Sequence, residues 1–419
     1  MSPSISYERK LNIGDELGYI DGFTHADLEP NKISLDVIID PSLMLPFDNG
    51  QFKLILVSSI FKKLLSENIA YLFRELRRIL HDDGSIILHF DGTCKTGKIS
   101  SDDFIYFAHF SGLQTSQSIS SYFSNLPGFN TINQDHVYTF HKPLISLNKD
   151  PLVSILIPAF RPDFFKQSLS SALSQTYQNI EILIGDDSLG DDIEAIVNSF
   201  DFKHVPVTYI KNPIRLKERE NMFQLFRLSK GDYIKFLNHD DILYPTCIET
   251  MAPILTNFSE IKLVTSKRRI IDKNGANLFE FNLPMKIETD VVFYGDKIVN
   301  LMSEFDNFVG EPTTAIFRKN DLRHIKPHFI SLNNTPGVPG APGDVIMWIN
   351  LLGQGSCAFL NSILSATRSH EGQSQLQPYF RDHVISGWDF IRSQLKKMGY
   401  INDNRIFYKI EVSNTQSHE

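Results

Sequence analysis

The sequence predicts an α/β protein of two domains, each built on a largely parallel sheet. Strand-length apolar segments alternate with helical patterns in two separate series along the chain. A stretch that contains both Pro and Asp, residues 141–150, separates the two series. The chain has 419 residues, which is enough for two or three domains of ~100–200 residues each. We therefore expect domains at residues 1–145 and 150–380, followed by a C-terminal helix and tail at 381–419.

The first series predicts a Rossmann-like sheet. A strongly amphipathic helix at residues 68–81, with apolar residues recurring at spacings of three and four, lies between two of its strands. The strands are expected at residues 10–14, 35–39, 52–57, 85–90 and 136–140.

The second series opens with a fully apolar strand, and its elements are joined by short connections that favour right-handed crossovers. Beyond residue 245 the alternation is less regular, and Asn274-Gly275 marks a hairpin turn. Strands are expected at residues 151–158, 180–185, 207–210 and 233–237, and helices at 164–175, 192–200 and 219–228.

Composition excludes several classes of protein. A net charge of −8 argues against a dedicated nucleic-acid binder. Three cysteines without a CxxC pair favour a reducing compartment and exclude a cysteine-built zinc site. No apolar run approaches the ~20 residues of a membrane span, and no signal-peptide pattern is present. We expect a cytoplasmic protein. The helix near residues 384–398 leaves a peripheral role at the inner membrane face or a role in dimerisation open, although its acidic and basic residues are mixed and form no polybasic cluster.

Three polar clusters follow strands of the second series, at residues 158–161, 186–188 and 238–241. Because the carboxyl ends of parallel strands share one edge of a sheet, we expect these clusters to converge. Carboxylates at such an edge suit a divalent cation that holds a diphosphate, and an acidic residue there can bind a nucleoside. The alternative is that these residues cap helices and close strands.

Residues 151–375 resemble the family 2 glycosyltransferases of the GT-A fold. Three ordered segments carry the resemblance, at residues 153–160, 174–188 and 230–243. It implies that Pro158, Ala159 and Phe160 pack on the nucleotide base of a nucleotide-sugar donor. It also implies that Asp187 reads the edge of that base.

The metal site is implied by the same resemblance. Asn238-His239-Asp240 stands where the family carries its DXD motif, which makes Asp240 the expected ligand of Mn²⁺ or Mg²⁺, with Asp241 beside it. Asn238 can bond the ribose or the metal, but it lacks the charge of the family's aspartate. His370 lies in a segment similar to a C-terminal motif whose histidine approaches the metal or the diphosphate, although a lone histidine is more often structural.

Between these motifs, residues 212–221 match the family segment beneath the nucleotide, where Asn221 recurs. Arg215, Lys217 and Arg219 can neutralise a diphosphate, since guanidinium and ammonium groups suit phosphate oxygens. For any one of them, a solvated position at the start of a helix is the simpler interpretation.

The acceptor side has its own resemblance. Glu311 lies in a segment similar to the family's acceptor-site strand, and Asp344 begins a helix whose leading acidic residue is the catalytic base of inverting members. Such a base takes the proton of the acceptor hydroxyl. Asp344 can also be a plain helix N-cap, and the two roles are compatible. Residues 335–343 are rich in glycine and proline and would serve as a lid.

The first series resembles a class I S-adenosylmethionine-dependent methyltransferase, on residues 11–18, 26–30, 45–52 and 73–84. The resemblance implies that Gly14 lies against the cofactor, that Asp27 binds its ribose and that Asp40 lies near its adenine. Glu16 stands where the family has its second glycine and adds a negative charge beside the cofactor's carboxylate. We therefore expect a degenerate scaffold domain, with an active methyltransferase as the alternative.

Together these resemblances predict an inverting, metal-dependent glycosyltransferase. Its donor would be a nucleotide-diphosphate sugar, most simply a UDP-sugar, and its acceptor a saccharide or lipid-linked glycan. The resemblance alone points to bacterial surface polysaccharide synthesis. The alternatives are a bifunctional methyltransferase–glycosyltransferase and a non-catalytic module of a glycan-assembly complex. The sequence leaves the sugar, the linkage and the oligomeric state open.

Overall fold

The chain forms two compact units in the computed structural model, one of Met1–Ile145 with Ser393–Asn404 and one of Ser146–Arg392 with Arg405–Glu419. Each is described by itself below. The structure describes residues 9–14, 20, 23–27, 36–39, 45–58, 60–64, 66–95, 97–111, 113–115, 137–142, 150–202, 205–281, 289–303, 307, 309–373 and 378–400.

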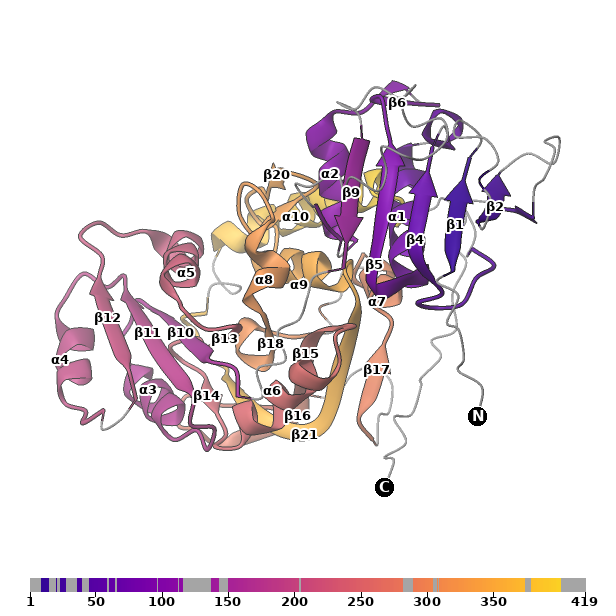
Figure 1. The fold of residues 1–419 in the computed structure, drawn as a ribbon. Helices are drawn as coiled ribbons and strands as arrows, with labels where there is room; N and C mark the ends of the chain where they lie inside the picture. The colour runs from indigo at the N-terminus through magenta and orange to yellow at the C-terminus, as the bar shows by residue number, and fades with distance from the viewer. Residues whose placement is uncertain are drawn as a thin grey trace, which may run out of the picture. The chain divides into compact units, whose positions relative to one another are not determined.

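The first unit is built on a seven-stranded mixed sheet of order β3-β2-β1-β4-β5-β9-β8 (Figure 1). The five strands from β1 to β5 pair in parallel, and β9 runs antiparallel to both β5 and β8. The strand order reverses direction between β1 and β4, which places a topological switch point there. The strands are β1 (Lys10–Ile13), β2 (Thr24–Asp27), β3 (Val37–Ile38), β4 (Phe52–Val57), β5 (Leu80–His89), β8 (Gln114–Thr115) and β9 (Val137–His141).

An aromatic cluster fills the core of this unit beneath helices α1 (Ser66–Ile79) and α2 (Ser101–Phe110). The rings of Phe90 and Phe104 stack with centroids 3.9 Å apart, and Phe73 meets both Phe104 and Phe140 edge-on. Edge-to-face and offset pairs of this kind are the favoured arrangements of aromatic rings. The unit also contains η1 (Ile60–Lys63), β6 (Thr93–Cys94) and β7 (Gly97–Lys98).

The predicted elements of the first series correspond to β1, β3, β4, β5, β9 and α1. The expected helix stops at Ile79, because Leu80 already begins β5. Strand β2 was not predicted, since its sequence Thr-His-Ala-Asp carries no apolar signal. His25 and Asp27 are nevertheless buried in it, and the His25 ring contacts the side chain of Asn12 on β1 at 3.3 Å.

The second unit is built on a ten-stranded mixed sheet whose main path is β12-β11-β10-β13-β18-β15-β21-β14 (Figure 1). Strands β10 to β13 are parallel, as the sequence predicts, whereas β18 runs antiparallel to β13 and β15. The strands are β10 (Val153–Ala159), β11 (Ile180–Asp186), β12 (Val207–Lys211), β13 (Tyr233–Phe236), β14 (Ile242–Leu243), β15 (Ile261–Ile271), β16 (Asn277–Phe281), β17 (Val291–Phe293), β18 (Ile316–Arg318) and β21 (Ser356–Arg368).

Helices cover both faces of this sheet. On one face, Val153, Ile155 and Ile157 of β10 pack in a core cluster with α3 (Phe165–Leu173), α4 (Asp192–Asn198) and α6 (Cys247–Asn257). On the other face, Phe226 of α5 (Lys217–Leu228) and Phe236 of β13 both contact Phe329. Helix α9 (Gly343–Leu352) also packs there, through Trp348 on Phe317 of β18. Because helices cover both faces of the sheet, β10 and β11 are buried along their whole length.

The rest of the second unit contains a long parallel ladder, a hairpin and several shorter elements. Strands β15 and β21 form a long parallel ladder, and β15 turns into β16 at Asn274-Gly275, which confirms the predicted hairpin. Gly275 has φ +86°, a conformation that favours glycine. The other elements are α7 (Gly295–Met302), η5 (Pro312–Thr314), α8 (Lys319–Arg323), β19 (Ser331–Leu332), β20 (Thr335–Pro336) and α10 (Pro378–Lys397). In the described part of the chain, no helix is both long and apolar enough to cross a membrane.

Candidate active site

A cavity of about 350 Å³ opens at the carboxyl ends of β10 and β11. Its wall combines an aromatic ring, two guanidinium groups and carboxylates, which suits a ligand with a flat ring and negative charge. The lining residues are Phe160, Arg161, Pro162, Asp187, Ser188, Leu189, Gly190, Asp192 and Arg215.

Asp187 is the buried carboxylate of this cavity. One of its oxygens accepts hydrogen bonds from the backbone N–H of Leu216 at 2.6 Å and from the Asn212 amide at 3.2 Å. The other accepts from the backbone N–H of Lys217 at 2.8 Å and lies 3.9 Å from Arg215 Nε. Lys217 has φ +66°, which is unusual for a residue other than glycine and aims its N–H at the carboxylate. The predicted base-reading residue is therefore held rigidly by the segment that precedes α5.

Asp186, the neighbouring carboxylate, was not singled out from the sequence. It is fully buried and accepts hydrogen bonds from Tyr209 Oη at 2.7 Å, Lys211 Nζ at 2.9 Å and Ser188 N at 2.8 Å. Burial by itself raises the pKa of Asp186, but the hydrogen bonds from Ser188, Tyr209 and Lys211 bring it below its usual value. Asp186 thus stays ionised and fixes the loop that carries Asp187.

Phe160 presents its ring to the cavity, and charged groups surround it. The guanidinium groups of Arg161 and Arg215 lie 5.2 and 5.8 Å from the ring centroid, and the His239 ring lies 4.5 Å away. Pro158 and Ala159, predicted to contact the base with Phe160, lie inside β10 and are not among the residues lining the cavity. The backbone carbonyl of Ala159 accepts a hydrogen bond from Asp187 N at 2.8 Å, so this pair supports the cavity from behind.

Asp240 faces His370 across the same edge, with Oδ2 and Nε2 2.9 Å apart. The backbone N–H of Gly372 donates to His370 Nδ1 at 3.1 Å, so the hydrogen-bond network assigns the ring proton to Nε2. Among the residues that the structure describes, no three His, Cys, Asp or Glu side chains form a metal cluster. One carboxylate with few protein partners still fits Mg²⁺ or Mn²⁺, because such ions share substrate phosphates and keep several waters.

Asp241 is directed into the protein. Its carboxylate is 1% exposed and accepts from Thr313 Oγ1 at 2.6 Å, Arg368 N at 3.0 Å and the Asn238 amide at 3.2 Å. Burial, followed by the neighbouring charge of Asp240, raises the pKa of Asp241 well above its usual value. These contacts make Asp241 the internal support of the 238–241 turn.

Arg368 is a second site residue to which the sequence analysis gave no role. It is fully buried, and its Nε donates to the backbone carbonyl of Asp240 at 2.9 Å. Its remaining nitrogens reach Gln167 Oε1 at 2.5 Å and the carbonyl of Asp272 at 3.1 Å. Arg368 therefore joins the 238–241 turn to α3 and to the β15–β16 hairpin. The sequence signal for Arg368 is its place two residues before His370, in the segment that resembles the C-terminal motif.

Asp344 lies in the first turn of α9, as predicted, and is half-buried. Its Oδ1 accepts from the backbone N–H of Val345 at 2.8 Å, and its Oδ2 accepts from the Asn307 amide at 2.8 Å. Burial, with a further contribution from the carboxylates of Glu311 and Glu218, raises the pKa of Asp344 to about 7. A carboxylate that titrates near neutrality is suited to general-base catalysis.

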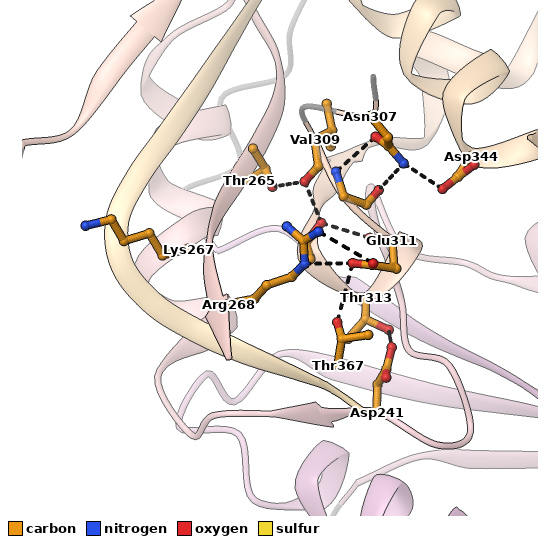
Figure 2. A network of polar contacts seen from close by, with 12 residues as sticks. Asp241, Thr265, Lys267, Arg268, Asn307, Val309, Glu311, Thr313, Asp344 and Thr367 are labelled. Atoms are coloured by element: carbon orange, nitrogen blue, oxygen red, sulfur yellow. Dashed lines mark hydrogen bonds and ion pairs between the residues drawn. The ribbon is translucent and has the colours of Figure 1, made fainter. Parts of the chain in front are cut away.

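Glu311 belongs to a polar network shown in Figure 2. Its carboxylate pairs with Arg268 Nε at 2.7 Å and accepts from Thr367 Oγ1 at 3.4 Å, while its side chain remains 30% exposed. Thr313, two residues further on, donates to Asp241. The segment of residue 307 and residues 309–314, here called the acceptor loop, therefore contacts both Asp344 and Asp241.

The basic residues before and within α5 do not act as one group. Arg215 lines the cavity and Lys217 is exposed beside it, whereas Arg219 Nη1 donates to the carbonyl of Gly337 at 3.0 Å, in the predicted lid. Asn221 is buried and donates to the carbonyl of Gly185 at 2.7 Å. Asn221 thus supports β11, and Arg219 connects α5 to the loop before α9.

Comparison with known proteins gives a family for part of the second unit. Residues 154–325 match the model of the family described as glycosyl transferase family 2. These residues form a family 2 glycosyltransferase domain. The family match does not extend to the first unit.

Relatives of the glycosyltransferase domain differ in how much of their length they share with it. An uncharacterized glycosyltransferase of Rickettsia bellii is 30% identical over 169 residues, covering 38% of this chain and 22% of that protein. UDP-Glc:alpha-D-GlcNAc-diphosphoundecaprenol beta-1,3-glucosyltransferase WfaP of Escherichia coli is 29% identical over 205 residues. The match covers 49% of this chain and 71% of that protein. The chain spans 21–40% of the length of the five Rickettsia glycosyltransferases it matches. A crystal structure of S. aureus TarS 1–349 in complex with UDP-GlcNAc aligns with a TM-score of 0.45 and 13% identity, over 58% of this chain and 66% of that one.

In the first unit, Gly14 follows β1 with φ +93°, and Asp27 ends β2. Asp27 is 2% exposed, and its carboxylate lies 3.5 Å from Lys63 Nζ. Asp40 lies outside the described residues, as does Glu16. The unit is a mixed α/β sheet, and its relation to methyltransferases stays a prediction.

Proposed function

We propose that the glycosyltransferase domain transfers a sugar from a UDP-sugar to a lipid-linked saccharide with inversion at the anomeric carbon. The observation that carries the proposal is Asp344, a half-buried carboxylate whose pKa of about 7 suits it to accept a proton. It lies in the same unit as a cavity with the chemistry of a nucleotide site.

In this proposal the donor occupies the cavity. Phe160 packs on the base, and one free lone pair of Asp187 accepts a hydrogen bond from an N–H group of the base. Arg215 and Lys217 together offset the negative charge of the diphosphate. The choice of uridine rests on the Escherichia coli relative, whose name specifies UDP-Glc. Asn221 contributes from beneath by fixing β11.

A divalent cation, Mn²⁺ or Mg²⁺, would be held at Asp240 with His370 and the Asn238 amide oxygen nearby, and it would stabilise the departing diphosphate. Asp241 contributes by fixing the turn from inside. His370 orients the Asp240 carboxylate through the 2.9 Å contact at Nε2.

The transfer step uses Asp344 as general base. The carboxylate takes the proton of the acceptor hydroxyl as that oxygen forms a bond to the anomeric carbon, and the bond from this carbon to the diphosphate oxygen breaks. UDP leaves with the electron pair, and Asp344 carries the proton away. In this proposal Glu311 binds a second hydroxyl of the acceptor, and its ion pair with Arg268 supports that role by fixing the carboxylate.

The test is transfer from radiolabelled UDP-glucose to a synthetic α-D-GlcNAc-diphospholipid in the presence of Mn²⁺. We expect a disaccharide lipid with inverted anomeric configuration by NMR, and Asp344→Asn should reduce kcat by ~10²–10⁴-fold with unchanged affinity for UDP. Full activity of Asp344→Asn would remove it from the mechanism. If UDP binds but no UDP-sugar is transferred to any lipid-linked saccharide, the non-catalytic alternative holds.

For the first unit we propose a degenerate methyltransferase-like domain, with boundaries at residues 1–145, preceding the 150–380 transferase domain and the 381–419 tail. The switch point between β1 and β4 and the acidic residue ending β2 support a nucleotide-binding ancestry. The ion pair with Lys63 engages one of the Asp27 carboxylate oxygens, which would otherwise accept a hydrogen bond from a ribose hydroxyl. Calorimetry with S-adenosylmethionine tests this, since measurable binding would favour the bifunctional alternative.

A further inference from the structure

We propose that Asn307 positions Asp344 for catalysis and sets its proton affinity. The inference rests on the proposed function in that Asp344 is taken as the base, but it concerns a contact on which that proposal does not depend. Asn307 lies at the start of the acceptor loop, with its amide directed at the Asp344 carboxylate (Figure 2).

The orientation of the Asn307 amide is fixed by its own hydrogen bonds. Its Oδ1 accepts from the backbone N–H of Gly310 at 3.0 Å, which an amide nitrogen could not do. The nitrogen Nδ2 therefore faces Asp344 Oδ2 at 2.8 Å, and it also lies 3.2 Å from the Gly310 carbonyl. Asn307 is consequently a donor to the base. An amide group rotated by 180° would turn its oxygen towards Asp344 and could not donate this hydrogen bond.

The turn that holds Asn307 is anchored to the helix that carries the base. Gly310 has φ +100°, and its carbonyl accepts from Trp348 Nε1 at 2.9 Å. Trp348 is fully buried and follows Asp344 by four residues, so both lie on one face of α9. Two side-chain contacts, one from each of these residues, thus keep the turn in register with the start of the helix.

The donated hydrogen bond has an electrostatic consequence. Burial, Glu311 and Glu218 all disfavour the ionised form of Asp344, whereas the hydrogen bond from Val345 N favours it. On general grounds, the hydrogen bond that Asn307 Nδ2 donates acts in the same direction as that from Val345 N. Each bond occupies one lone pair of a different carboxylate oxygen, which fixes the plane of the group. The remaining lone pairs are left to accept a proton, so Asn307 orients the base and favours its ionised form.

Two substitutions separate this role from a merely structural one. Asn307→Asp is isosteric and keeps the oxygen that accepts from Gly310 N, but it replaces the donor with a second carboxylate beside Asp344. Asn307→Ala removes both contacts without adding charge. Asn300→Ala is the matched control, because the Asn300 amide donates only to the Asp296 carbonyl of its own helix.

The experiment titrates Asp344 by carboxyl-¹³C NMR in the full chain, with its resonance assigned by its loss in Asp344→Asn. The pH profile of kcat/KM for UDP-glucose and the synthetic α-D-GlcNAc-diphospholipid is measured alongside. We expect the acid limb and the Asp344 titration to move to higher pH in Asn307→Ala and further in Asn307→Asp, with Asn300→Ala matching the wild type. At pH 6, kcat/KM should fall by about tenfold or more in both variants and partly recover at pH 8.5, while the KM for UDP-glucose stays unchanged.

A role confined to the turn predicts the opposite order, with Asn307→Asp close to wild type and Asn307→Ala worse. That order, or an Asp344 titration that is the same in all variants, overturns the inference. If the wild-type protein transfers no sugar, the proposed function fails, and the NMR titration still decides the role of Asn307 by the same criteria.

Discussion

Asp344 is a carboxylate whose proton affinity differs between the folded and unfolded chain. Its pKa rises from 3.8 to about 7 on folding, mainly through burial. The native state therefore binds more protons than the unfolded state between these values, so this group's contribution to stability is present at low pH and is lost as pH rises through 7. Asp344→Asn removes this dependence.

We accordingly expect Asp344→Asn to melt at a higher temperature than the wild type at pH 8.5 and at nearly the same temperature at pH 4. Thermal denaturation followed by circular dichroism across this range measures the difference. Asp191→Asn, at an exposed position, provides the control. A difference in Tm that is constant with pH would contradict the assigned pKa.

Asp240 and Asp241 are adjacent in sequence but have different surroundings, which predicts different mutant phenotypes. Asp240→Ala should abolish the Mn²⁺ dependence of UDP binding with little change in Tm, because its partner His370 is itself partly exposed. Asp241→Ala should destabilise the fold by about 1–3 kcal/mol, since Thr313, Asn238 and the Arg368 N–H lose their buried acceptor. Calorimetry with UDP, with and without Mn²⁺, and urea denaturation separate the two. Equal effects of both substitutions on UDP binding would indicate a shared metal site.

Among the elements, helix α10 makes an unusually close contact with the loop before α9. A Cβ atom at Gly387 would lie 2.2 Å from both Ala341 N and Gly340 C, which are backbone atoms that cannot yield easily. We expect Gly387→Ala to destabilise the second unit by about 1–3 kcal/mol and to lower transfer more than UDP affinity, because the displaced loop leads directly to Asp344. Urea denaturation and transfer assays measure the two effects. Gly190→Ala serves as the stability control, since the nearest atom to its added Cβ is 3.6 Å away.

The elements differ in how well the sequence predicts them. The strands β10, β11 and β13 and the helix α9 were predicted because their signal is local, a buried apolar run or an acidic residue at a helix start. The pairing of β15 with β21 was not predicted, because it joins segments that lie about a hundred residues apart in the sequence.

The same distinction applies to the site. Asp187, Asp240 and Asp344 stand in motifs that can be found from sequence. The functions of Arg368 and Asn307 depend instead on partners distant in the chain, namely the carbonyl of Asp240 and the carboxylate of Asp344. Asp241 shows the limit most clearly, because the sequence places it beside the expected metal ligand Asp240, while its hydrogen bonds direct it into the core.

For the whole molecule, ligand-induced stabilisation distinguishes the proposed states of the two units. A ligand that binds only the native state stabilises it by RT ln(1 + [L]/Kd), about 2.7 kcal/mol at a hundredfold excess over Kd. We expect UDP with Mn²⁺ to raise the Tm of the full chain, UDP with EDTA to raise it less, and S-adenosylmethionine to leave it unchanged. Differential scanning calorimetry measures all three. A rise with S-adenosylmethionine would contradict a degenerate first unit, and no response to UDP would contradict the proposed donor site.

The acceptor loop also limits how this molecule can diversify. Thr313 contacts Asp241 in the turn beneath Asp240, the proposed metal ligand, and Asn307 contacts Asp344, the proposed base. We therefore expect a change that reshapes the loop for a new acceptor to disturb the donor side at the same time. Substitutions in this loop should therefore be epistatic with substitutions at residues 238–241, and double-mutant combinations should depart from additivity. We therefore expect these positions to change together in a lineage that acquires a different acceptor.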